Sequence, residues 1–196
     1  MALVVRSEDL HRRFTEDVLR NPFNREILAR LPRLGLDQAY LVAGCLVQTI
    51  WNEVSGRPAT ADIKDYDVFY FDDRDLSWEA EDGAIRRAAG LFADLGVTVE
   101  LRNQARVHLW FERRFGVPYP RLTSTKDGID RFLTPCTCVG IRPVAAEGHE
   151  VYAPYGLDEL YAGLLRPNPA NDQPRLFEAK AASYRARWPW LTITAA

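Results

Sequence analysis

The chain has 196 residues and a formal net charge of −2 at pH 7, with 47% hydrophobic and 27% charged residues. These proportions are typical of a soluble globular protein, and the mild acidity disfavours binding of long nucleic acid, which needs a basic surface. No apolar run approaches the roughly 20 residues of a membrane helix, and the N-terminal MALVVRSEDLHRRF is charged too early for a secretory signal. The three cysteines form no CxxC pair, which argues against a zinc ribbon or thioredoxin motif and favours a cytoplasmic protein with reduced thiols.

The N-terminal part predicts two helices, followed by a strand that leads directly into a third helix. Apolar residues recur at helical spacing over 8–20 and 23–34. The short apolar run AYLVAG, 39–44, predicts a strand. It continues into CLVQTIWNEVSG, 45–56, where the apolar residues again recur at helical spacing and a glycine ends the helix.

The next segment, IKDYDVFYF at 63–71, has the β-branched and aromatic residues of a buried strand, except for two carboxylates at its start. Asp65 and Asp67 are two positions apart, and alternate strand residues share a face, so their side chains are expected roughly 7 Å or less apart. Carboxylates this close repel unless something compensates them. An acidic loop and a helix should follow, and then a strand at 97–103 whose polar face carries Glu100.

The rest of the chain predicts a mixture of helices and strands. The expected elements are helices at 105–116, 123–133, 156–167 and 175–188, and strands at 136–144 and 149–156 joined by a turn at 145–148. No segment separates as an independent domain, so we expect one α+β domain. Its parts would be N-terminal helices at 1–36, a core at 37–103, and a helical and β part at 104–196.

Three of these features together suit one kind of ligand. Gly44 opens a helix, and the first N–H groups of a helix bind phosphate oxygens well. Asp65 and Asp67 can share divalent cations, which cancel their repulsion. Glu100 on the next strand can complete the shell of one metal, or orient or deprotonate an attacking hydroxyl. The pattern therefore predicts a site for a metal-bound nucleoside triphosphate.

At this point the sequence resembles a known superfamily, the nucleotidyltransferases with a DNA polymerase β-type palm. There, a strand–Gly–helix element precedes Asp-x-Asp on a strand and a further acidic residue on a later strand, as in YLVAGCLVQTIW, KDYDVFYF and VTVELRN here. More narrowly, the chain resembles a bacterial family of uncharacterised nucleotidyltransferase-like proteins over roughly 14–191, through AGCLVQTIWN, DYDVFYFD, RNQARVHLW, PYPRLTST and RARWPWL. The resemblance implies a small mixed sheet with flanking helices, and Mg²⁺ or Mn²⁺ bound by Asp65, Asp67 and Glu100.

The resemblance also implies residues that contact the NTP. Gly44 and Cys45 would hold the phosphates, and Arg102 would either reach a phosphate or neutralise Glu100, whose strand face it shares. Cys45 departs from the superfamily, which usually has glycine or a small hydroxyl residue there, so a side-chain hydrogen bond to phosphate would be lost. Other polar residues are expected in structural or solvated positions: Asp62 in a loop, Thr123, Ser124 and Thr125 at a helix start, and Lys180, Arg185 and Arg187 on the solvated side of the last helix.

Three functions are compatible with this sequence. The first is metal-dependent transfer of a nucleoside monophosphate from an NTP to a hydroxyl of an unknown acceptor, such as a small molecule, a protein side chain or an RNA end. The second is a non-catalytic protein that keeps the fold and binds a nucleotide or a partner, which Cys45 and the absence of an obvious acceptor domain favour. The third, a metal hydrolase, is disfavoured because no His-Asp metal pair, HExxH motif or nucleophile elbow occurs.

Overall fold

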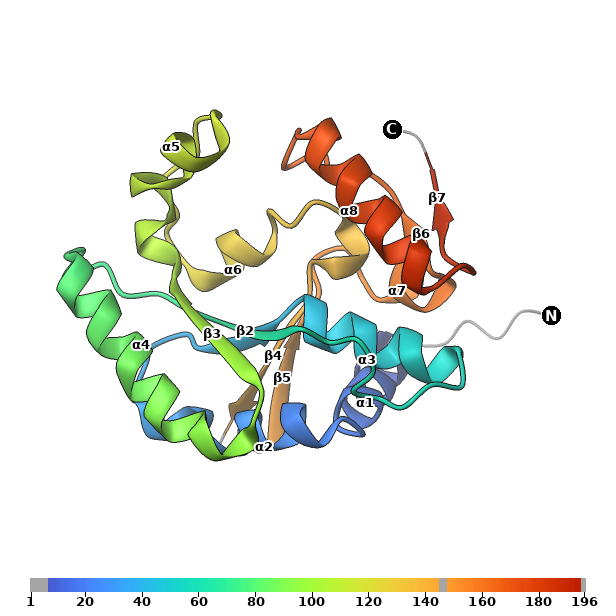
Figure 1. The fold of residues 1–196 in the computed structure, drawn as a ribbon, viewed down its shortest axis with the longest axis horizontal. Coiled ribbons are helices and arrows are strands. Elements are labelled where there is room, and N and C mark those ends of the chain that lie inside the picture. The colour runs from blue at the N-terminus through green and yellow to red at the C-terminus, as the bar shows by residue number, and fades with distance from the viewer. Residues whose placement is uncertain (1–6, 145–147, 195–196) are drawn as a thin grey trace.

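The computed structural model describes residues 7–144 and 148–194, which are arranged around a five-stranded sheet (Figure 1). Short 3-10 turns connect several of the regular elements. In chain order these elements are α1 (Ser7–Val18), α2 (Pro22–Arg30), β1 (Tyr40–Val42), α3 (Gly44–Val54), β2 (Asp65–Tyr70), α4 (Trp78–Phe92), β3 (Thr98–Asn103), α5 (Phe111–Phe115), α6 (Thr125–Ile129), β4 (Gly140–Val144), β5 (Gly148–Tyr152), α7 (Asp158–Ala162), β6 (Leu164–Leu165), α8 (Pro174–Arg187) and β7 (Thr192–Ile193).

The sheet is mixed, with strand order β3-β2-β1-β4-β5. Strands β2 and β3 are parallel and are joined through α4, whereas β1 runs antiparallel to both β2 and β4, and β4 pairs antiparallel with β5. A parallel pair needs a long crossover, which the α4 segment provides. The mixed sheet with flanking helices is the α+β architecture that the sequence predicts.

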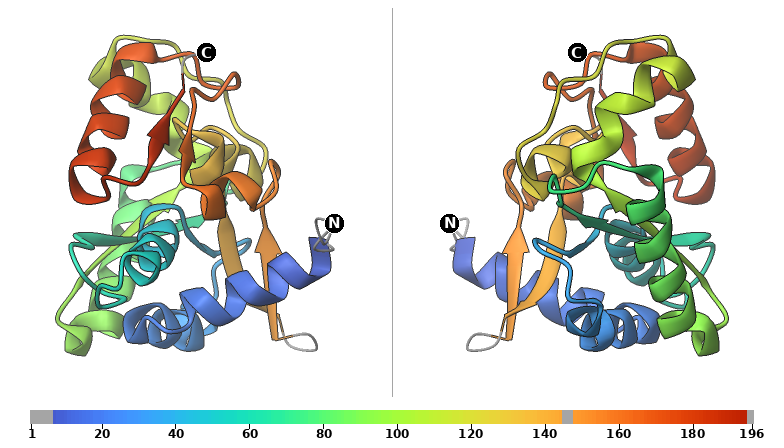
Figure 2. Two further views of the ribbon diagram at one scale, coloured as in Figure 1. Left: turned by 90° about the vertical axis from the view of Figure 1, so that its right-hand side faces the viewer. Right: turned by 90° about the vertical axis from the view of Figure 1, so that its left-hand side faces the viewer.

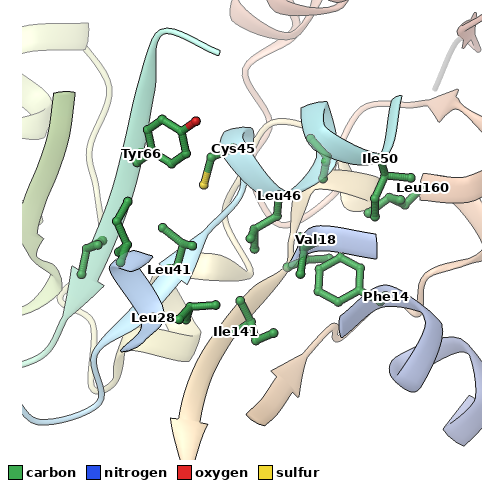
Figure 3. Close-up of a cluster of buried hydrophobic side chains, with 14 of the residues drawn as sticks. Phe14, Val18, Leu28, Leu41, Cys45, Leu46, Ile50, Tyr66, Ile141 and Leu160 are labelled. Atoms are coloured by element: carbon green, nitrogen blue, oxygen red, sulfur yellow. The ribbon is translucent and has the colours of Figure 1, made fainter. Parts of the chain in front are cut away.

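One face of the sheet is covered by the N-terminal helices and holds the main core. Figure 2 shows α1 and α2 on the lower side of the molecule and α5 and α8 on the upper side. Helix α4 packs along β3, and α3 packs on β2 and α1. Figure 3 shows part of the core, in which the labelled side chains are Phe14, Val18, Leu28, Leu41, Cys45, Leu46, Ile50, Tyr66, Ile141 and Leu160.

The side chains of β2 point alternately into the core and toward the site. Tyr66 and Val68 are buried in the core beneath the helices. Asp65, Asp67 and Phe69 point to the opposite face, as the period of two requires. The register continues this face across the sheet, because Asp67 is the partner of Glu100 on β3 and of Val42 on β1.

Only part of this second face is covered. The Phe69 ring stacks on Phe132 just after α6, with ring centroids 5.5 Å apart, and both pack on a small cluster that includes Tyr40 and Ile129. Helix α6 begins with a capping box at Ser124, as the cap pattern predicts. It covers the Phe69 end of β2 and leaves the Asp65–Asp67 end free to line a pocket.

Helix α8 is anchored over α3 by aromatic side chains. The Trp51 ring lies 5.1 Å from the Tyr184 ring and 5.5 Å from the Trp188 ring, measured between centroids. The indole N–H of Trp188 donates to Asn52 Oδ1 at 2.9 Å. These contacts pack α8 against α3. They also place the exposed side of α8 beside the carboxyl pair, Asp65 and Asp67.

Two predicted helices are shorter or more broken than expected. Segment 105–116 divides into a 3-10 turn at Gln104–Leu109 and the short α5, because the Asn103 side chain accepts the Ala105 N–H and caps a tight turn. Segment 123–133 contributes only α6, which ends before Asp130.

Two further boundaries were wrong in the C-terminal part. The strand expected at 136–144 begins only at Gly140, since Pro135–Thr137 forms a 3-10 turn. The helix expected to reach Pro167 ends at Ala162, where Gly163 takes a positive φ of 66°, and Leu164–Leu165 pairs with β7 instead. Of the turn expected at 145–148, residues 145–147 lie outside the described residues. Within the described ranges, no helix combines the length and apolar character needed to cross a membrane.

Candidate functional site

The turn between β1 and α3 forms one wall of the site and has a strained backbone. Ala43 has φ 48° and ψ −113°, a conformation that costs a non-glycine residue free energy. Its carbonyl accepts the N–H groups of Leu46 and Val47, and no side chain caps the helix. The N–H groups of Gly44 and Cys45 therefore have no partner within the helix, and they point toward its N-terminal end.

The strained residue of this turn is Ala43 and not the glycine that follows it. Gly44 is already the first residue of α3, and Ala43 takes the positive φ. A Cβ at Gly44 would lie 3.0 Å from Gln48 Nε2, so the Gln48 side chain would have to shift slightly to admit a larger residue.

The Cys45 side chain does not face the site. It is fully buried in the core beside Leu41 and Tyr66 (Figure 3), and its thiol donates to the Val42 carbonyl at 3.6 Å. Burial raises the pKa of this thiol well above its ordinary value. Only the backbone N–H of Cys45 can contact a phosphate, so the absence of a hydroxyl at this position has no consequence for the pocket.

Asp65 and Asp67 line one pocket of about 140 Å³, which we call the acidic pocket. Its other walls come from the β1–α3 turn, the loop that leads into β4, and α8; the lining residues are Ala43, Gly44, Gln48, Phe132, Leu133, Thr134, Thr137, Lys180 and Tyr184. Among the described residues, no hydrogen bond or ion pair reaches the side-chain oxygens of Asp65 or Asp67. The two carboxylates thus project into the pocket with their oxygens unengaged.

The electrostatics of Asp67 reflect this crowding. Burial, the Asp65 carboxylate and the Glu100 carboxylate raise its pKa to about 7, and Lys180 and Arg102 offset them only in part. A cation that enters the pocket would therefore stabilise the ionised form of Asp67.

Glu100 and Arg102 lie on β3 next to this pair. The Cα of Glu100 is in register with that of Asp67. Its Oε2 accepts a hydrogen bond from Arg102 Nη2 at 3.1 Å, so the two side chains neutralise each other. The part of the chain that the structure describes contains no group of three or more His, Cys, Asp or Glu placed to hold a metal ion. Glu100 therefore lies beside Asp65 and Asp67 but does not form a three-carboxylate metal site with them.

Lys180 is the residue of the site that the sequence did not reveal. We expected it on the solvated side of the last helix, and its side chain is indeed exposed, yet it borders the acidic pocket. Desolvation lowers its pKa, while Asp65 and Asp67 act to raise it. Its positive charge therefore acts on the carboxyl pair from α8, although no ion pair joins Lys180 to either carboxylate among the described residues. No local motif marks it, because it reaches the site only through the packing of α8.

Arg187, from the same helix, makes hydrogen bonds that hold α8 next to the pocket. Its Nη1 donates to Gln48 Oε1 at 2.8 Å and to the Asp62 carbonyl at 3.2 Å. Asp62 itself forms an ion pair with Arg57 and does not line the acidic pocket. Arg187 thus ties α8 to α3 and to the loop before β2, a structural role in place of the solvated one expected.

Two further hollows adjoin the acidic pocket. The α5–α8 cleft, of about 440 Å³, shares Leu133 and Lys180 with it. An aromatic pocket of about 180 Å³ shares Phe132 with it and is also lined by Arg102, Gln104, Trp110 and Tyr119. The site is thus a central acidic pocket with two extensions.

Comparison with known proteins agrees with this geometry. A family model described as nucleotidyltransferase matches residues 29–193. The chain belongs to this nucleotidyltransferase family. Among solved structures, it is similar to a protein whose NMR structure is said to reveal a CCA-adding enzyme head domain, with 26% sequence identity and a TM-score of 0.76 over 99% of this chain and 98% of that one. No curated protein matches the sequence.

Membership of the family confirms the superfamily that the sequence resembles, and the solved structure confirms the α+β nucleotidyltransferase fold. Nucleotidyl transfer is the general activity of this family. The roles of Asp65, Asp67, Glu100, Gly44, Cys45 and Arg102 stay predictions.

Proposed function

We propose that the protein transfers a nucleoside monophosphate from an NTP to a hydroxyl group of an acceptor, using a divalent metal held by Asp65 and Asp67. The observation that carries the proposal is the pair of partly buried carboxylates, unpaired within the described chain, that faces both a helix N-terminus and the Lys180 ammonium. A small acceptor or a protein side chain suits the mildly acidic chain better than long nucleic acid.

The donor set fits Mg²⁺ or Mn²⁺. Both are hard cations that take oxygen ligands, and Mg²⁺ is commonly bound by one or two protein carboxylates together with substrate phosphates and water. Asp65 and Asp67 supply two such carboxylates without a competing hydrogen bond. A bound divalent cation would withdraw charge from the phosphates and lower the pKa of the attacking hydroxyl.

Residues of the chain itself would bind the phosphates, neutralise their charge and accept the proton of the acceptor hydroxyl. The N–H groups of Gly44 and Cys45 can donate to phosphate oxygens, and Lys180 can neutralise the triphosphate from the opposite wall. Once Arg102 turns from Glu100 toward the substrate, Glu100 can accept the proton of the acceptor hydroxyl. The acceptor oxygen then bonds to the α-phosphorus while the bond from that phosphorus to the bridging oxygen breaks, and pyrophosphate leaves.

Calorimetry of a double variant tests the proposal. Asp65→Asn combined with Asp67→Asn should abolish Mg²⁺-dependent binding of a non-hydrolysable NTP analogue, because the neutral amides cannot hold the cation. The matched control is Asp73→Asn, an exposed carboxylate outside the pocket. Unchanged affinity in the double variant, with the fold intact by circular dichroism, would refute the proposed metal site.

A second function is favoured by one observation. Because Arg102 holds Glu100, the described residues present two carboxylates to a metal where the superfamily pattern has three. A non-catalytic protein that binds nucleotide would fit this state. Pyrophosphate release distinguishes the two, since binding of NTP with no release in excess Mg²⁺ and any acceptor extract would favour the binding protein.

A further inference from the structure

The α5–α8 cleft is larger than the aromatic pocket, the other hollow described beside the acidic pocket. It is lined by Phe111, Phe115, Leu133, Asn171, Gln173, Leu176, Ala179, Lys180 and Ser183. Figure 1 shows α5 and α8 standing apart above the sheet, and the cleft lies between them. Its volume of about 440 Å³ is in the range of small-molecule sites. Because Leu133 and Lys180 belong to both hollows, a ligand with its phosphates at Asp65 and Asp67 can extend into the cleft.

The walls of the cleft present apolar surface to solvent. Phe115 on α5 is 41% exposed and Leu176 on α8 is 38% exposed, although both are large apolar residues. The Phe115 ring is backed by Phe111, with centroids 4.6 Å apart, and Phe111 is backed in turn by Tyr119 at 4.3 Å. This cluster of tilted rings supports the wall against which a flat ligand can lie.

The two amide side chains of the cleft, Asn171 and Gln173, are joined by a hydrogen bond. Asn171 Nδ2 donates to the Arg131 carbonyl at 2.5 Å, and Gln173 Nε2 donates to Asn171 Oδ1 at 2.6 Å. A backbone carbonyl can only accept, so this chain of hydrogen bonds fixes the orientation of both amides. They brace the loop before α8, and among the described residues the Oε1 and the second N–H of Gln173 make no hydrogen bond. The cleft therefore offers ring faces together with an amide edge at Gln173.

Of the two extensions of the site, the cleft is the one suited to the donor nucleotide. The aromatic pocket adjoins the cleft at Phe111 and Asn171, but it is lined by Arg102, the partner of Glu100, and Glu100 is the group proposed to accept the proton of the acceptor hydroxyl. The leaving phosphates belong on the side of Lys180, which also borders the cleft.

We infer that the α5–α8 cleft holds the nucleobase of the NTP against Phe115 and Leu176. The inference rests on the proposed function, since the phosphates must occupy the acidic pocket. Every base has a π face that can lie on an aromatic side chain, so the loss of Phe115 should weaken the binding of all four nucleotides.

Titration calorimetry with two kinds of probe tests the inference. The probes are the α,β-methylene analogues of ATP, GTP, CTP and UTP, and inorganic tripolyphosphate, each with Mg²⁺. Phe115→Ala and Leu176→Ala should each weaken all four analogues, by about tenfold for Phe115→Ala because a stacking partner is lost. Neither change should alter the affinity for tripolyphosphate, which has no base. The control is Trp78→Ala, a 64% exposed aromatic residue on α4 outside the cleft.

The outcomes separate this inference from the proposed function. Weaker binding of the analogues to Phe115→Ala and Leu176→Ala, with unchanged binding of tripolyphosphate, would support it. Unchanged analogue binding in both variants would overturn it while Mg²⁺-dependent tripolyphosphate binding still stood. If neither probe bound the unaltered protein with Mg²⁺, the proposed function would fall and this inference with it.

Discussion

Replacing Asp67 with Asn should change how the stability of the protein depends on pH. Asp67 is a partly buried carboxyl that faces Asp65 and Glu100. In the folded protein its pKa is raised from 3.8 to about 7, first by burial and then by these two carboxylates. In the unfolded chain, the carboxyl returns to its ordinary value. The protein therefore loses stability when Asp67 must ionise in the folded state.

The sign and size of the effect follow from proton linkage. Between pH 3.8 and about pH 7 the folded state binds more protons at Asp67 than the unfolded state, so the free energy of unfolding falls as pH rises. The stability that the folded protein keeps while Asp67 is protonated is fully present below pH 3.8 and is lost above about pH 7. A difference of about three pH units corresponds to about 4 kcal/mol, and partial solvent screening reduces it to about 2–4 kcal/mol.

Urea denaturation in EDTA measures this difference. The free energy of unfolding of the Asp67→Asn variant, minus that of the unaltered protein, should rise by about 2–4 kcal/mol between pH 4 and pH 8. Asp73→Asn serves as the control, because its carboxyl is exposed and distant from the acidic pocket. If the difference between variant and unaltered protein stays constant over this pH range, Asp67 is not held in a repulsive, desolvated environment and the reasoning fails.

Two further changes test other parts of the structure. Lys180→Met should weaken Mg²⁺-tripolyphosphate binding about tenfold or more in calorimetry, because a charge-assisted contact is removed; the exposed Lys64→Met is the control, and equal losses in both variants would contradict a specific role. Glu81→Gln should lower the free energy of unfolding by about 3 kcal/mol in urea, because it leaves the buried Arg106 without its ion-pair partner; a change below about 1 kcal/mol would show that Arg106 is compensated otherwise.

The sequence by itself determined the carboxyl pair and its side of the sheet. Alternation in IKDYDVFYF puts Asp65 and Asp67 on one face and Tyr66 and Val68 on the other, and the structure has this arrangement. The same rule put Glu100 and Arg102 together on β3, where they form a hydrogen bond. These results follow from strand geometry, which is local and depends only on neighbouring positions.

Tertiary packing decided which other residues surround the pair. Lys180 lies on a helix whose sequence reads as solvated on that side, and it borders the acidic pocket because Tyr184 and Trp188 pack on Trp51. The same packing lets Arg187 bind Gln48 next to the pocket. No short-range pattern encodes that contact, since it joins residues far apart in the chain.

Packing also decided the detail of the turn between β1 and α3. The sequence predicts a helix that begins near Gly44, but it does not indicate that Ala43 takes a positive φ, where its N–H donates to the Val139 carbonyl at 2.9 Å. Cys45, which seemed to face the phosphates, is turned into the core instead. The direction of a side chain at a strand–helix junction depends on what packs beneath it, and only the folded chain supplies that.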